Sequence, residues 1–146
     1  NPRLTVRDVP GRDPVPIVLT RSGNMPKDCH LQKPGTLLVT PPDTLSDHTS
    51  TAWTTAGAKI VETDTEDLDT LLKTFGTMGI ASLLVEGGAG IFGAFVEQGL
   101  VNEYQLYSAP VILGAGISWA GLTRNRTMAK AIRLDGRDTC ICLRES

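Results

Sequence analysis

Four short apolar runs, separated by long polar or turn-rich stretches, constrain the fold of this chain more than any other feature. The runs are PIVLT at residues 16–20, TLLVT at 36–40, AKIVET at 58–63 and IASLLVE at 80–86. Their apolar residues are not confined to alternate positions, which is typical of strands buried on both faces. Parallel strands also need long connections such as these. The runs therefore predict an α/β fold whose sheet is largely parallel.

Two segments between and after these runs have helical patterns. In residues 65–79, Thr65 is placed to cap a helix and Gly79 to end it. Residues 88–99 predict a second helix, and a further short helix is expected near residues 50–56. The apolar stripes that support the two main helices are Leu68, Leu71, Leu72 and Phe75 in the first, and Ile91, Phe92, Phe95 and Val96 in the second.

The last third of the chain has a different pattern. Residues 102–113 alternate like a half-solvated strand, and residues 114–127 are typical of a long loop. Residues 129–145 contain two runs on either side of Asp135 and Gly136, and an Asp-Gly pair is a strong signal for a tight antiparallel hairpin. We therefore expect one α/β domain over residues 1–146, with a mixed, mostly parallel sheet and a C-terminal antiparallel hairpin.

Composition argues against several classes of partner. The net charge is −2, and the 14 basic and 16 acidic residues are interspersed, so we expect no nucleic-acid and no membrane partner. No run approaches the roughly 20 apolar residues of a membrane span. Three cysteines cannot form a complete set of disulfides, which favours a reducing compartment, so we predict a cytoplasmic location.

No metal site is predicted. Cys140 and Cys142 share one face of a predicted strand, but no third or fourth ligand lies near them in the sequence. Cys29, His30 and His48 form no constellation for metal binding or nucleophilic catalysis, so we interpret them as surface or packing residues.

A glycine-rich turn follows the fourth apolar run. Gly88, Gly90 and Gly93 have the spacing G-x-G-x-x-G and open a predicted helix. Glycines let a ligand approach the backbone closely, and the N–H groups of a first helical turn favour a diphosphate. The dinucleotide fold that shares this motif also needs a carboxylate about 20 residues on, and Tyr107 and Ser108 stand there instead. The alternative is that the glycines only permit close packing of helix on sheet.

Glu86 ends the fourth run, directly before this turn. Ligands of open α/β sheets collect at the carboxyl ends of strands. A carboxylate beside a phosphate-binding turn would repel the phosphate unless it served another part of the ligand. We therefore predict that Glu86 hydrogen-bonds a polar substrate or handles a proton. The alternative is that Glu86 caps the following helix.

Three stretches of the chain resemble one family. LLVEGGAGIFGAFVEQGLVNEYQLYSAPVILG at residues 83–114 closely resembles the C-terminal reductase domain of the bifunctional riboflavin-biosynthesis deaminase/reductase. NPRLTVR at residues 1–7 resembles a second signature of that family, and PVPIVLTRSGNMPKDCHL at residues 14–31 resembles its next strand and turn. The resemblance covers nearly the whole chain.

The resemblance implies a dihydrofolate-reductase-like three-layer fold and a reaction. NADPH would reduce 5-amino-6-(5-phosphoribosylamino)uracil, a phosphorylated pyrimidine, to its ribitylamino product, with hydride reaching C1 of the opened ribose. By the family pattern, Glu86 lies at the substrate as the catalytic residue, and Arg7 binds the substrate phosphate with help from the backbone near Leu4. The residues implied at the cofactor are Thr20, Arg21, Ser22, Gly88, Ala89, Gly90, Ile91, Phe92, Gly93 and Ala94. We also expect a homodimer.

The chain departs from the family pattern in two places. The family commonly has Asp followed by Thr or Ser where this chain has Thr20 and Arg21. This leaves room for a reductase of another pteridine or pyrimidine, and Arg21 is our candidate for the 2′-phosphate of NADPH. The family's opening strand and helix would precede Asn1, so we expect a domain incomplete at its N-terminus. A non-catalytic nucleotide-binding remnant is therefore a third alternative. The deaminase signature, H-x-E with P-C-x-x-C, does not occur in this sequence.

Overall fold

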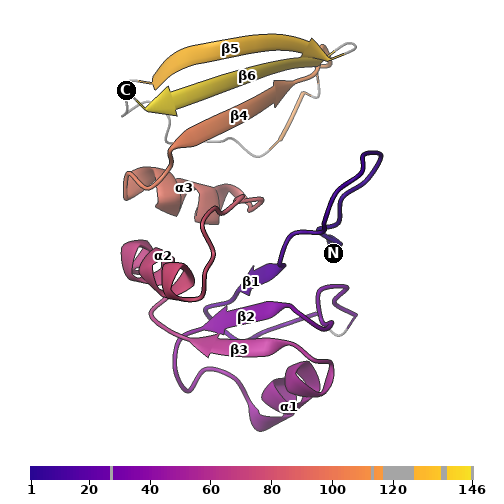
Figure 1. Cartoon of the computed structure of the whole chain (residues 1–146), viewed down its shortest axis with the longest axis vertical. Helices are drawn as coiled ribbons and strands as arrows, with labels where there is room; N and C mark the ends of the chain where they lie inside the picture. Colours follow the sequence, from indigo (N-terminus) through magenta and orange to yellow (C-terminus); the bar gives the residue numbers. More distant parts are fainter. Residues whose placement is uncertain (27, 113, 117–126, 136–137, 146) are drawn as a thin grey trace. The chain divides into compact units, whose positions relative to one another are not determined.

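The structure is a computed structural model, and it describes residues 1–26, 28–112, 114–116, 127–135 and 138–145 (Figure 1). The chain divides into two compact units, Asn1–Phe75 and Gly76–Ser146. None of the helices in the described part is both long and apolar enough to span a membrane. In chain order the elements are β1 (Ile17–Leu19), β2 (Leu37–Thr40), α1 (Asp47–Thr55), β3 (Lys59–Glu62), α2 (Leu68–Thr77), α3 (Ala89–Glu97), β4 (Glu103–Ser108), β5 (Thr127–Asp135) and β6 (Asp138–Glu145).

In the first unit, β1, β2 and β3 form a parallel sheet with β2 in the middle (Figure 1). The register aligns Val18 with Leu38 and Leu38 with Ile60. All four residues of β2 are buried, as expected for a central strand of a parallel sheet. The first three strands predicted from the sequence are therefore confirmed, and the parallel pairing explains why their apolar residues do not alternate.

The core of this unit joins β2 to α1. Leu38, Trp53 and Ala58 form a buried cluster, with exposed fractions of 0%, 2% and 7%. α1 starts earlier than the expected residues 50–56, because Ser46 caps it: the Ser46 hydroxyl accepts a hydrogen bond from the Thr49 N–H at 3.2 Å. The cap therefore adds a first turn whose polarity had hidden it in the sequence.

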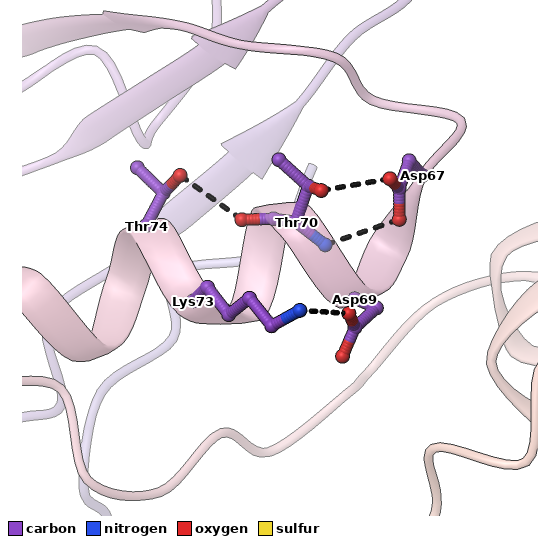
Figure 2. Close-up of polar contacts among 5 residues, drawn as sticks. All are labelled: Asp67, Asp69, Thr70, Lys73 and Thr74. Atoms are coloured by element: carbon purple, nitrogen blue, oxygen red, sulfur yellow. Dashed lines mark hydrogen bonds and ion pairs between the residues drawn. The ribbon is translucent and has the colours of Figure 1, made fainter.

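α2 confirms the first of the two main predicted helices, but the predicted cap at Thr65 is wrong. The cap is Asp67, whose carboxylate accepts hydrogen bonds from the Thr70 N–H at 3.1 Å and from the Thr70 hydroxyl at 2.7 Å (Figure 2). Thr65 is buried, with 4% exposed. The helix begins at Leu68, and a cap must directly precede the first helical residue, where Asp serves as well as Thr.

In the second unit, β4, β6 and β5 form an antiparallel sheet with β6 in the middle. This confirms the half-solvated strand and the C-terminal hairpin, although residues 136–137 of the predicted turn lie outside the described residues. α3 confirms the second main helix. Its Phe92 ring meets the Tyr104 ring of β4 edge-on, with centroids 6.3 Å apart. The helix is closed at Gly99, where φ is +66° and the N–H donates to the Val96 carbonyl at 3.1 Å.

The fourth strand predicted over residues 80–86 is not formed. These residues have no regular secondary structure, and no described strand pairs with them. Leu84 is 77% exposed, whereas Leu83 and Val85 are half-buried. An extended run becomes a strand only where a neighbour supplies the opposing hydrogen bonds, and an apolar pattern does not identify that neighbour. The α/β class, the parallel sheet and the hairpin are confirmed, but the parallel sheet has three strands and the hairpin lies in a sheet of its own.

Candidate functional site

Within the part of the chain that the structure describes, no side chain caps the N-terminus of α3. Gly88 occupies the cap position, and no described side chain accepts a hydrogen bond from the first turn. That turn also contains no acidic residue. The first N–H groups of a helix have no partner within the helix and carry partial positive charge. This end of α3 therefore has the properties of an anion-binding site.

The glycines around this helix end fall into two kinds. A Cβ added at Gly88, Gly90 or Gly93 would meet no described atom within 4 Å. A Cβ added at Gly87 would lie 1.7 Å from Cγ2 of Ile91, which real structures do not tolerate. Close packing therefore explains Gly87, which lies outside the G-x-G-x-x-G spacing. It does not explain the three glycines that make up the spacing.

The other residues predicted at the cofactor in this segment contribute mainly backbone. Ala89 is exposed, and Phe92 and Ala94 are half-buried within the helix. The Phe92 ring is engaged with Tyr104, as described above, and the Ile91 side chain lies against Gly87. A ligand at this end of α3 would thus meet N–H groups and open glycine Cα atoms rather than long side chains.

Glu86 is exposed, two residues before the cap position of α3. It forms no hydrogen bond or ion pair with any described residue, and it does not cap the helix. The alternative that Glu86 serves as a cap is therefore not supported. Its carboxylate is therefore exposed close in sequence to the N-terminus of α3.

Leu4 and Arg7 belong to the irregular segment that precedes β1. Leu4 is half-buried and has φ of +50°, a left-handed conformation that costs a residue with a bulky side chain about 1–2 kcal/mol. Strained backbone of this kind is concentrated at ligand-binding sites. The Arg7 side chain is exposed, and neither of the ion pairs among the described residues involves it. Its guanidinium is therefore accessible for binding an anion.

Thr20, Arg21 and Ser22 form the turn that follows β1. Thr20 is buried, and its hydroxyl accepts a hydrogen bond from the Gly23 N–H at 3.1 Å. Gly23 has φ of +67°, and a Cβ there would lie 2.9 Å from the Thr44 carbonyl oxygen, so only glycine suits this turn. Arg21 and Ser22 are exposed, so Arg21 is a cation at the carboxyl end of a parallel strand, where ligands of such sheets bind.

The predicted site residues thus lie on both units. Leu4, Arg7 and residues 20–22 belong to the first unit, and Glu86 and residues 88–94 belong to the second. Among residues 1–26, 28–112, 114–116 and 138–144, no group of three or more His, Cys, Asp or Glu side chains could hold a metal ion. The three cysteines are free thiols.

Sequence reasoning missed two polar residues that hold the first segment in place. The Asn1 side-chain amide donates to the Asp28 carbonyl, and its oxygen accepts from the His30 N–H at 2.9 Å. The Asp13 carboxylate accepts from the Val6 N–H at 2.9 Å. The contacts of Asn1 join residues distant in sequence, and the contact of Asp13 crosses a loop. Helix or strand periodicity predicts neither kind of contact.

Sequence comparison shows the family of the chain and similarity to proteins that are named as reductases. The family profile of the RibD C-terminal domain matches residues 1–141. A 2,5-diamino-6-ribosylamino-4(3H)-pyrimidinone 5′-phosphate reductase of Aquifex aeolicus is 34% identical over 118 residues, covering 78% of this chain and 53% of the relative. A protein of the same name from Methanothermobacter thermautotrophicus is 31% identical over 92% of this chain and 66% of its own length. The chain thus spans about half the length of the Aquifex relative.

Solved structures agree on the fold. The diaminohydroxyphosphoribosylaminopyrimidine deaminase/5-amino-6-(5-phosphoribosylamino)uracil reductase of Thermotoga maritima has a TM-score of 0.78. Its sequence is 18% identical, and the match covers 99% of this chain and 41% of that chain. The riboflavin biosynthesis reductase Rib7 of Saccharomyces cerevisiae has a TM-score of 0.65 with 19% identity, over 92% of this chain and 70% of its own. The resemblance predicted from residues 83–114 is confirmed, and the chain belongs to the family of RibD C-terminal domains.

Proposed function

We propose that this chain reduces the ribosylamino group of a pyrimidine 5′-phosphate with NADPH, as a step of riboflavin biosynthesis. The observation that carries the proposal is the family match over residues 1–141, together with 34% identity to a protein named as a reductase of that substrate class. Three features of the described residues support it: a helix N-terminus without a side-chain cap, an arginine outside the ion pairs, and an exposed carboxylate.

The open end of α3 fits the diphosphate of a dinucleotide. Gly88 and Gly90 leave space where any other residue would place a Cβ, and the first-turn N–H groups have no side-chain acceptor. When bound, NADPH supplies the hydride. Residues 88–94 hold the diphosphate by their backbone, which fixes the cofactor without contributing a reactive side chain.

Arg7 and Glu86 act on the substrate. The Arg7 guanidinium binds the substrate phosphate through a forked pair of charge-assisted hydrogen bonds, and the backbone at Leu4 lines the same phosphate. The Glu86 carboxylate accepts hydrogen bonds from polar groups of the substrate near the reacting sugar. This orients the acceptor carbon, and orientation is the main protein contribution to hydride transfer.

Arg21 contributes to the choice of cofactor. Its exposed guanidinium follows β1, where the family implies contact with NADPH. A cation at this position favours the additional 2′-phosphate that distinguishes NADPH from NADH. Replacing Arg21 with Ala is expected to lower the preference for NADPH over NADH about tenfold in kcat/KM.

The direct test is oxidation of NADPH by the purified protein, with the ribosylamino-pyrimidine phosphate as substrate. Glu86→Gln and Arg7→Ala are each expected to lower kcat/KM at least tenfold, about 1.4 kcal/mol. Glu97→Gln, at the exposed far end of α3, and Arg12→Ala are the matched controls and should leave kcat/KM unchanged. Wild-type turnover in both site variants would overturn the site assignment, and no turnover of any pyrimidine phosphate in a substrate panel would overturn the function.

Three further properties accompany this proposal. The family match covers residues 1–141, which supports one reductase domain. The free cysteines suit a reducing compartment such as the cytoplasm. Exposed Tyr107, Val111 and Ile112 offer an apolar surface for a homodimer, which light scattering of the purified protein would detect as twice the mass of the chain.

A further inference from the structure

We propose that Asp13 is a positioning residue for Arg7: its carboxylate closes the loop of residues 6–13 and so presents the Arg7 guanidinium to the substrate phosphate. The inference rests on the proposed role of Arg7. It assigns to Asp13 a task that the sequence pattern does not indicate, because Asp13 lies in an irregular, proline-rich segment.

The loop is closed by one hydrogen bond. The Val6 N–H donates to Oδ1 of Asp13 at 2.9 Å. A carboxylate that accepts from a backbone N–H forms a charge-assisted bond, which is stronger than a bond between neutral groups. Since Val6 directly precedes Arg7, this bond fixes the backbone from which the Arg7 side chain projects.

Packing inside the loop supports the same conformation. A Cβ placed on Gly11 would lie 3.4 Å from Cγ1 of Val6, so the Val6 side chain lies over Gly11. Val6 is half-buried, whereas Arg7 and Asp8 are exposed. Asp8 has φ of +62°, a conformation that Asp adopts more readily than most residues. The loop thus packs around the Val6 side chain, and the Arg7 side chain is exposed to solvent.

Asp13 and Arg7 are not paired with each other among the described residues. Asp13 takes part in neither of the ion pairs among the described residues, and Arg7 takes part in neither. If the two side chains were paired, the carboxylate would compete with a substrate phosphate for the guanidinium. Bonding to the Val6 N–H instead lets Asp13 order the loop and leaves Arg7 unpaired.

Ordering the loop before the substrate arrives lowers the entropy lost on binding. Without the bond, residues 6–13 would have to be ordered by the phosphate itself. Losing Asp13 should therefore weaken substrate binding and leave the chemical step nearly unchanged. Because the effect passes through Arg7, it should require both Arg7 and the substrate phosphate.

The test compares steady-state kinetics of Asp13→Ala, Asp13→Asn and Asp8→Asn in the full chain. Asp13→Ala is expected to raise KM for the phosphorylated substrate about fivefold, with kcat within twofold. Asp13→Asn keeps an acceptor oxygen and should recover part of the loss. Asp8→Asn removes one charge from the same loop without touching the bond, and it should match the wild type. With the dephosphorylated substrate, or in an Arg7→Ala background, Asp13→Ala should have no further effect.

A measurement independent of turnover separates this inference from the proposed function. Exchange of the Val6 amide proton, followed by NMR, should be faster in Asp13→Ala than in the wild type and in Asp8→Asn. Unchanged Val6 exchange, or a KM equal to that of the wild type while Arg7→Ala is impaired, would overturn the role of Asp13. Faster Val6 exchange in a protein whose Arg7→Ala variant is fully active would confirm the loop closure and overturn the role of Arg7 instead.

Discussion

The N-termini of α2 and α3 are built in opposite ways. At α2 the Asp67 carboxylate accepts two hydrogen bonds from Thr70, and Asp69 follows in the first turn (Figure 2). At α3 the cap is Gly88, no side chain accepts from the first turn, and no acidic residue lies there. One helix end is thus capped by a side chain, whereas the other receives no side-chain cap from the described residues.

The difference separates what stabilises the fold from what serves the ligand. Capping residues of the α2 kind each stabilise a helix, and the proposed cofactor site would explain why α3 has Gly88 there instead. A substitution can therefore add a capping carboxylate at α3 or remove the charge of the one at α2. A change at α3 should affect cofactor binding, whereas a change at α2 should affect stability alone, which makes the comparison testable.

The largest effect is expected from Gly88→Asp, which gives α3 the kind of cap that α2 has. The new carboxylate would lie where the cofactor diphosphate is proposed to bind. Two like charges in direct contact repel each other by several kcal/mol. KM for NADPH should rise about 100-fold, while the melting temperature stays the same or rises slightly, because Asp caps at least as well as Gly.

Gly88→Asn is the matched control for this change. Asn has nearly the same size and also caps well, but it carries no charge. A rise in KM that is much smaller for Asn than for Asp would attribute the effect to charge. Equal KM values for Gly88→Asp and the wild type would show that the anion does not bind at this end of α3.

The next effect is on stability and comes from Gly87→Ala. The added Cβ would lie 1.7 Å from Cγ2 of Ile91, and Ile in a helix has little freedom to change its χ1 angle. Overpacking of this kind costs about 2 kcal/mol in the free energy of unfolding, measured by urea denaturation. Adding Ile91→Ala to Gly87→Ala should remove the clash, so the double variant should lose less than the sum of its parts. Additive losses would contradict the clash.

The contrast between Gly87 and its neighbours also shows what the sequence could predict. The G-x-G-x-x-G spacing predicted an anion-binding turn, and the open space at Gly88, Gly90 and Gly93 agrees with it. The same pattern did not reveal that Gly87, outside the spacing, is the glycine that packing requires. Composition and spacing report which residues are small, whereas only coordinates report what lies beside them.

The strands show the same limit. Runs 16–20, 36–40 and 58–63 became β1, β2 and β3, since their own hydrophobic pattern and their mutual pairing agree. Run 80–86 is as apolar but pairs with no described strand. The polar contacts of Asn1 and Asp13 could not be predicted at all, because they depend on which loops meet. Sequence periodicity therefore predicts helices and strands, whereas strand pairing and contacts between loops require the structure.

A smaller, two-sided effect is expected from Gly90→Ala. In α3, replacing Gly with Ala raises helix propensity, which should stabilise the fold by about 0.5 kcal/mol. The new Cβ enters the open space proposed for the cofactor, so KM for NADPH should rise about tenfold. Gly76→Ala is the control: Gly76 lies in α2, and a Cβ there also meets nothing within 4 Å. It should bring a similar gain in stability with no change in KM, and a tenfold rise for both would contradict the role of Gly90.

The smallest effect concerns the charge of Asp67. The hydrogen bond from the Thr70 hydroxyl, followed by that from the Thr70 N–H, lowers the pKa of Asp67 below its usual value. A carboxyl whose pKa is lower in the folded than in the unfolded chain stabilises the fold above its unfolded pKa, and this contribution is lost as pH falls through the folded pKa. Asp67→Asn keeps a capping oxygen but removes the charge.

The variant should therefore melt at a slightly lower temperature than the wild type at neutral pH, and the difference should vanish in acid. Scanning calorimetry over that pH range would measure it. Asp47→Asn, in the first turn of α1, is the control, since the Ser46 hydroxyl rather than Asp47 accepts the capping hydrogen bond there. Its melting temperature at neutral pH should differ less from that of the wild type. A difference between Asp67→Asn and the wild type that persists unchanged into acid would mean that the oxygen geometry, not the charge, closes α2, and the contrast with α3 would then rest on hydrogen bonding alone.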